Sequence, residues 1–139
     1  MKRSLSVLLI AILFSAAVVY AVDYYTYANV KTIMNTNGCI GCHPAFGTYN
    51  TMISMTSSAA ATSGLFIVNP AKPDSSVIIW RLEGKMADGS PLASMPMGED
   101  MLPDDMIRIF RDWIEQGAVE TLVGVDDTRT WGDIKRKFK

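Results

Sequence analysis

Both cysteines and the only histidine of this 139-residue chain lie in one short stretch, Cys39-Ile40-Gly41-Cys42-His43. Thiolates are the reactive form of cysteine, and thiolate and imidazole are both strong ligands for transition metals. The whole thiol and imidazole chemistry of the protein is therefore concentrated at one point of the chain. Any fold that the sequence adopts has to present these three side chains together.

The spacing C-x-x-C-H is typical of covalent c-type haem attachment. Each thiolate, from Cys39 and from Cys42, can add to one vinyl group of the porphyrin and form a thioether bond. His43 is then held on one face of the ring, where its imidazole can bind the iron as the proximal ligand. The motif predicts one covalently attached haem c and its iron.

The same spacing could also belong to a disulfide or dithiol redox pair, or to a zinc site. A C-x-x-C pair beside alternating strands and helices would indicate a thioredoxin-like redox pair, but no such alternation surrounds Cys39 and Cys42. A zinc site needs a fourth ligand, and the chain has no further cysteine or histidine, so Asp or Glu would have to supply it. Haem attachment is the favoured interpretation.

The N-terminus predicts export. Lys2 and Arg3 precede an apolar run from Leu5 to Val19, and Ala21 stands where a signal peptidase would cut. We therefore expect residues 1–21 to be a signal peptide and the rest of the chain to be periplasmic or otherwise extracytoplasmic. The alternative is an uncleaved membrane anchor over 5–22, since this run is just long enough to span a bilayer. Membrane association would then be through the N-terminus.

Composition excludes one class of partner. Hydrophobic residues make up 49% and charged residues 19% of the chain, and the formal net charge is −1. A nucleic-acid-binding protein needs a basic face, which this balance does not suggest. No array of catalytic bases and nucleophiles is visible, so we do not expect an enzyme.

Apolar periodicity predicts a chain of helices. The expected helices run from Asp23 to Asn37, from Thr48 to Met55, from Asp74 or Ser75 to about Glu83, and from Pro103 to Gly117. The last is the clearest, because its apolar residues recur at i, i+3, i+4, i+7 and i+8. Leu65 to Val68 is expected to be an extended wall segment. A further stripe of Trp131, Ile134 and Phe138 suggests an amphipathic helix in the tail.

The segment 85–102 is rich in Gly and Pro and is expected to be a loop. It holds Met95-Pro96-Met97, and a thioether from this loop suits the sixth position of a haem iron, opposite His43. Met95 is favoured, because the residue before proline has a restricted backbone, and Met97 is the alternative. The other interpretation is that both methionines only fill gaps beside the haem.

Three further groups bear on the expected haem site: one backbone carbonyl and two side chains. A carbonyl of Asn69 or Pro70 is expected to accept the Nδ1 hydrogen of His43, as ligating histidines usually require. Trp80 is expected to pack either on the porphyrin edge or simply in the core. Arg81 is expected either to pair with a haem propionate or to be an ordinary solvated arginine.

The motifs of the chain, and their order along it, resemble those of class I monohaem cytochromes c, and in particular those of planctomycete-type cytochrome c domains. The segments that carry the resemblance are Cys39 to His43, Asn69-Pro70, Ser75-Ser76-Val77, Arg81-Leu82, Met95-Pro96, Asp112-Trp113-Ile114 and Gly117-Ala118. It covers about Tyr25 to Val119. The resemblance implies an all-α, small class I cytochrome c fold of three to five helices around one haem. It also implies attachment at Cys39 and Cys42, with His43 proximal and Met95 distal; Met97 is a departure from the pattern.

The expected organisation is a signal peptide over 1–21, a cytochrome c domain over 22–119 and a C-terminal extension over 120–139. The expected function is electron transfer with an exported or membrane-bound redox partner protein. Two alternatives stay open. One is a gas-binding or sensing haem protein with a displaceable methionine, and the other is a haem subunit of a larger membrane-associated redox complex.

Overall fold

The computed structural model describes residues 23–122. The predicted signal peptide and the stripe of Trp131, Ile134 and Phe138 lie outside these residues. Within 23–122 the chain is helical and has no strand, so the prediction of an all-α fold is confirmed. The α-helices are α2 (Tyr27–Thr36), α3 (Cys39–Cys42), α4 (Tyr49–Ser54), α5 (Val77–Glu83) and α6 (Asp104–Glu115), with single turns of 3₁₀-helix at Pro44–Gly47, Ala60–Thr62 and Pro73–Ser75.

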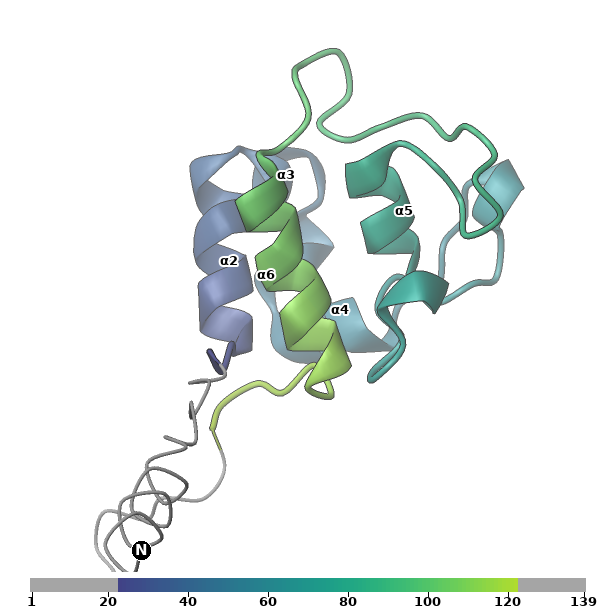
Figure 1. Ribbon diagram of the computed structural model, residues 1–139. Helices are drawn as coiled ribbons and strands as arrows, with labels where there is room; N and C mark the ends of the chain where they lie inside the picture. Colours follow the sequence, from purple (N-terminus) through teal and green to yellow (C-terminus); the bar gives the residue numbers. More distant parts are fainter. Residues whose placement is uncertain (1–22, 123–139) are drawn as a thin grey trace, which may run out of the picture.

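Helix α6 lies between α2 and α5 and packs against both (Figure 1). Its predicted apolar face is buried, and Phe110, Trp113 and Ile114 are at most 1% exposed. Asp104 and Asp105 occupy the first turn, where a helix favours acidic side chains. Pro103 lies one residue before the helix rather than inside it, and a left-handed Gly117 follows the helix end. The long loop 85–102 therefore meets α6 at its N-terminal end.

Helix α2 is shorter than predicted, because it begins at Tyr27 rather than at Asp23. The side-chain oxygen of Gln116, just beyond α6, accepts the Tyr25 N–H at 2.9 Å, and the Gln116 side-chain nitrogen donates to the Asp23 carbonyl at 2.7 Å. These bonds hold the chain before α2 against the end of α6 in a non-helical path. The two ends of the described chain consequently lie at the same end of the molecule (Figure 1).

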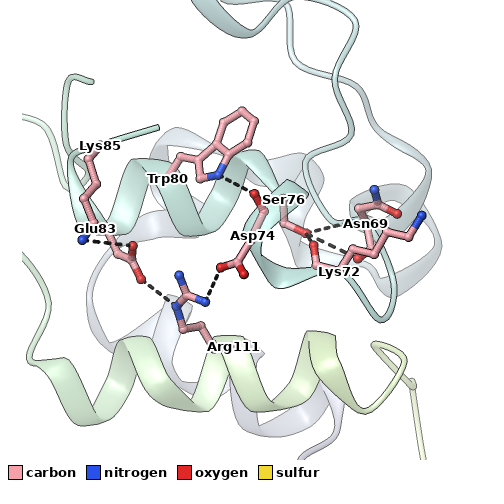
Figure 2. A network of polar contacts seen from close by, with 8 residues as sticks. All are labelled: Asn69, Lys72, Asp74, Ser76, Trp80, Glu83, Lys85 and Arg111. Carbon is pink, nitrogen blue, oxygen red and sulfur yellow. Dashed lines mark hydrogen bonds and ion pairs between the residues drawn. The ribbon is translucent and has the colours of Figure 1, made fainter. Parts of the chain in front are cut away.

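Helix α5 also begins later than predicted, at Val77 with Ser76 as its cap residue. Asp74 and Ser75 belong instead to the preceding 3₁₀ turn. The fully buried Ser76 hydroxyl accepts the Asn69 N–H at 2.8 Å and donates to the Lys72 carbonyl at 3.0 Å (Figure 2). The serine thus closes the loop before α5 instead of bonding to the first turn of the helix.

The segment Leu65 to Val68, predicted to be extended, has a single bridge, between Thr56 and Phe66, and bends at Leu65, Ile67 and Val68. The first two residues of the segment are exposed and the last two are buried. Phe66 is 50% exposed, whereas Ile67 and Val68 are buried. The bridge to Thr56 holds Phe66, the residue before Ile67. Ile67 is buried, and its carbonyl accepts the N–H of Ile78 in α5 at 3.1 Å.

Arg111 joins α6 to α5 and to the turn before it (Figure 2). Its Nε donates to a Glu83 oxygen at 2.6 Å, and its Nη1 donates to an Asp74 oxygen at 2.7 Å. The Glu83 hydrogen bond is the main cause that raises the pKa of Arg111 above its usual range. The Trp80 indole donates to the Asp74 backbone carbonyl at 3.0 Å and completes this side of the fold.

A search of residues 23–122 for membrane spans finds no helix with the length and apolar character to cross a bilayer.

Candidate functional site

The C-x-x-C segment forms one helical turn, α3, directly after α2. Gly38 separates the two helices in a left-handed conformation, with φ of 70°, which glycine adopts without the usual steric cost. Residues three apart lie on the same side of a helix, so Cys39 and Cys42 project from one face of this turn. The His43 N–H donates to the Cys39 carbonyl at 2.8 Å, and this bond holds the histidine at the end of the turn.

The two thiols differ in their surroundings. Cys42 is exposed, whereas Cys39 is half-buried, and its Sγ lies 3.9 Å from the Asn37 carbonyl oxygen. Burial is the largest cause that raises the pKa of the Cys39 thiol. Both cysteines are free in the structure.

The His43 ring stacks on the ring of Phe46, with centroids 4.9 Å apart and planes inclined by 16°. The Phe46 N–H donates to the His43 carbonyl at 2.9 Å, which closes the turn between them. The structure has no hydrogen bond from His43 to Asn69 or Pro70, and the prediction of such a bond is wrong. The Asn69 backbone faces the Ser76 hydroxyl instead.

A cleft of about 720 Å³ opens beside α3. All three side chains of the motif line it, and so do Met95 and Met97 of the long loop. Its apolar wall comes from Met34 of α2, Ile67, Val77, Ile78 and Leu82 beside or within α5, and Phe110 of α6. Residues from 34 to 110 therefore converge on one space, and the fold brings together every residue that the sequence singled out as a haem attachment point or iron ligand.

The two methionines of the loop are held differently. The Met95 N–H donates to the Arg81 carbonyl at 2.8 Å, so the backbone of Met95 is tied to the last turn of α5. The Met95 side chain is half-buried, whereas Met97 is 79% exposed. Met97 has no comparable backbone hydrogen bond among the described residues. The structure thus distinguishes two methionines that have similar sequence surroundings.

Arg81 holds the same loop with its side chain. Its Nη1 donates to the Ala93 carbonyl at 3.0 Å, while the residue also lines the cleft. Trp80, the next residue back, does not line the cleft, and its indole bonds to the Asp74 carbonyl as described above. Of the two interpretations of Trp80, packing away from the cleft is the one that the structure supports.

The structure also shows which potential metal ligands come together. Among residues 23–122, no three side chains of His, Cys, Asp or Glu come together in a way that could hold a metal ion. The potential ligands that line the cleft are two thiols, one imidazole, several thioethers and the carboxylate of Glu99.

Two contributors to the site were missed by sequence reasoning. The Tyr27 hydroxyl donates to the Phe46 carbonyl at 2.5 Å, and Phe46 in turn carries the stacked His43 ring. The apolar spacing in α2 shows that Tyr27 is buried, but nothing in the sequence indicates a partner 19 residues away. Phe46 follows the motif closely, and its aromatic character was the only available signal.

Comparison of the chain with protein-family models, with curated proteins and with solved structures finds no match.

Proposed function

We propose that this protein is an electron carrier with one haem c, attached through Cys39 and Cys42 and ligated by His43 and Met95. One observation carries the proposal. The C-x-x-C-H segment and the methionine loop, more than fifty residues apart in the sequence, line the same cleft. The expected export signal and the class I cytochrome c resemblance of the motifs point the same way.

The residues at the cleft fit a haem. Its volume of about 720 Å³ is typical of pockets that enclose cofactors. The wall is apolar, which suits a porphyrin, and Arg81 and Glu99 bring charge to the lining. Arg81 is the one cationic residue among the lining residues, and we propose that it also pairs with a propionate.

Met95 is a better candidate than Met97 for the sixth ligand. A thioether that stays bound through a redox cycle has to be held in place by the protein and shielded from water. Met95 is half-buried and its backbone is hydrogen-bonded to Arg81, whereas Met97 is 79% exposed. A neutral thioether ligand favours the ferrous state and raises the reduction potential.

The haem iron would supply a one-electron couple, with one electron gained from one partner and given to the next. The chain's own part is to keep the ligands in place and exclude water. Neither task needs a catalytic base. Because the only histidine is already used, the chain has no second imidazole for proton transfer. We propose that the partners are redox proteins, exported or membrane-bound, and that the protein works outside the cytoplasm.

The test is expression in a host that matures c-type cytochromes. The purified protein should be coloured, and its mass should exceed that of the chain by one haem. The same mass also shows whether residues 1–21 are removed, which decides between a cleaved signal peptide and the anchored subunit of a larger complex. A colourless protein with two free thiols would overturn the proposal.

The ligand is tested with a matched pair of variants. Met95→Ala should abolish the long-wavelength charge-transfer band of a ferric methionine–iron bond, and Met97→Ala should leave it unchanged. Both variants remove one thioether from the same loop, so the comparison isolates ligation from loss of volume. Ready carbon monoxide binding by the unaltered ferrous protein would favour the gas-binding function instead.

A further inference from the structure

We infer that the Tyr27 hydroxyl positions the His43 ring, acting through Phe46. The inference rests on the proposed function in one respect, because there His43 is the proximal ligand of the iron. Tyr27 itself does not line the cleft, so any effect on His43 has to pass through the residues between them. Tyr27 is therefore proposed as a positioning residue.

The contacts from Tyr27 to His43 are continuous. The Tyr27 hydroxyl donates to the Phe46 carbonyl at 2.5 Å. The Phe46 N–H donates to the His43 carbonyl at 2.9 Å, and the two rings stack with centroids 4.9 Å apart. The hydroxyl thus anchors the one aromatic residue that packs on the imidazole face.

The Tyr27 end of this chain of contacts is firmly held. Tyr27 is only 6% exposed, and its ring packs edge-on against Tyr49 at 5.7 Å and tilted against Trp113 at 6.3 Å. Its N–H donates to the Val119 carbonyl at 3.0 Å. Burial raises the pKa of Tyr27, so the hydroxyl keeps its proton and remains a donor at neutral pH. A fixed donor of this kind can hold the Pro44–Gly47 turn in one position.

The packing of the Tyr27 ring does not by itself require a hydroxyl. Phenylalanine would fill the same space between Tyr49 and Trp113. The hydroxyl has one partner among the described residues, the Phe46 carbonyl. A role that depends on this oxygen is therefore separable by experiment from a role in the core.

The experiment uses the full chain, purified from a cytochrome-maturing host and reduced. His43 is the only histidine, so histidine labelled with ¹³C and ¹⁵N gives a single set of ring resonances in an NMR spectrum. A proton above the face of Phe46 is shielded by the ring. In Tyr27→Phe we expect the His43 ring resonances to shift and broaden, because Phe46 loses its anchor.

Tyr49→Phe is the matched control. It removes a tyrosine hydroxyl that has no hydrogen bond among the described residues, from a ring in contact with Tyr27. The His43 resonances should stay in place in this variant. If Tyr27→Phe lowers the melting temperature but leaves the His43 resonances where Tyr49→Phe leaves them, Tyr27 has only a structural role and the inference is wrong.

A second variant tests the route. Phe46→Leu removes the stacked ring and should shift the His43 resonances in the same direction as Tyr27→Phe. Adding Tyr27→Phe to Phe46→Leu should then change them little further; equal and additive shifts would overturn the route through Phe46. Absorbance and mass decide haem attachment separately, so a colourless protein refutes the proposed function, whereas unmoved His43 resonances refute this inference.

Discussion

Removing the Arg111 guanidinium should destabilise the protein by about 2 kcal/mol. The bond from Arg111 to Glu83, whose side chain is 19% exposed, is a partly buried hydrogen bond between charged groups. Such a bond contributes about 1.5 kcal/mol. The bond to Asp74, which is 79% exposed, contributes about 0.5 kcal/mol, because solvent screens it.

The variant for this test is Arg111→Met, which keeps most of the aliphatic stem, and the assay is thermal or urea unfolding of the purified protein. A loss of about 2 kcal/mol corresponds to a fall in melting temperature of about 8–16 °C for a domain of this size. Arg108→Met is the control. Arg108 lies on the same helix and is exposed, and it has no ion pair among the described residues. It should change stability by less than about 0.5 kcal/mol.

Salt separates the two bonds of Arg111. The exposed Asp74 pair should lose most of its contribution in about 1 M salt, where the screening length is about 3 Å. The Glu83 bond should keep most of its contribution. Asp74→Asn should accordingly cost about 0.5 kcal/mol at low salt and almost nothing at high salt. If Arg111→Met is no more destabilising than Arg108→Met, the assignment of α5–α6 packing energy to this network is wrong.

Three further predictions concern other parts of the fold. Gly84→Ala should cost about 1 kcal/mol in chemical unfolding, because Gly84 has φ of 67° and an alanine there would be strained. Trp113→Phe should cost about 2 kcal/mol, because it leaves a cavity in a fully buried site and removes the 2.8 Å bond from the indole to the Val119 carbonyl. Stability should fall as the pH rises above about 10, because the folded state holds the Tyr27 proton more tightly than the unfolded chain does. In unfolding titrations, Tyr27→Phe should flatten that fall, and an unchanged slope would show that another group causes it.

Local sequence patterns predicted α6 well, because nothing distant competes with them. An acidic first turn, a continuous apolar face and a glycine beyond the end all lie within the helix or next to it. The start of α2 was predicted wrongly for the opposite reason. Gln116 is more than ninety residues from Asp23 and Tyr25, yet its side chain bonds to both backbones. No local pattern carries that information.

The same distinction applies to the cleft. The spacing of Cys39, Cys42 and His43 predicts a haem attachment motif, and the structure places all three residues at one cleft. The predicted methionine ligand could be narrowed only to Met95 or Met97, because the two residues have almost the same local sequence. The contact that separates them is a backbone bond from Met95 to Arg81, which depends on where α5 ends.

The hydrogen bond expected for the His43 ring is not found in the structure, where a different residue contacts the ring. Ligating histidines usually donate their second ring N–H to an acceptor, and the Asn69 or Pro70 carbonyl was the acceptor expected from the sequence. In the structure Ser76 bonds to the Asn69 backbone, and the contact on the His43 ring comes from Phe46. A stacked aromatic ring supports the histidine without a hydrogen bond, so the hydrogen-bonding residues of the sequence do not predict this support. This support can be recognised only in the structure, where Phe46 stacks on His43 and accepts a hydrogen bond from the Tyr27 hydroxyl. Removing the Tyr27 hydroxyl is therefore an informative test of how the His43 ring is held.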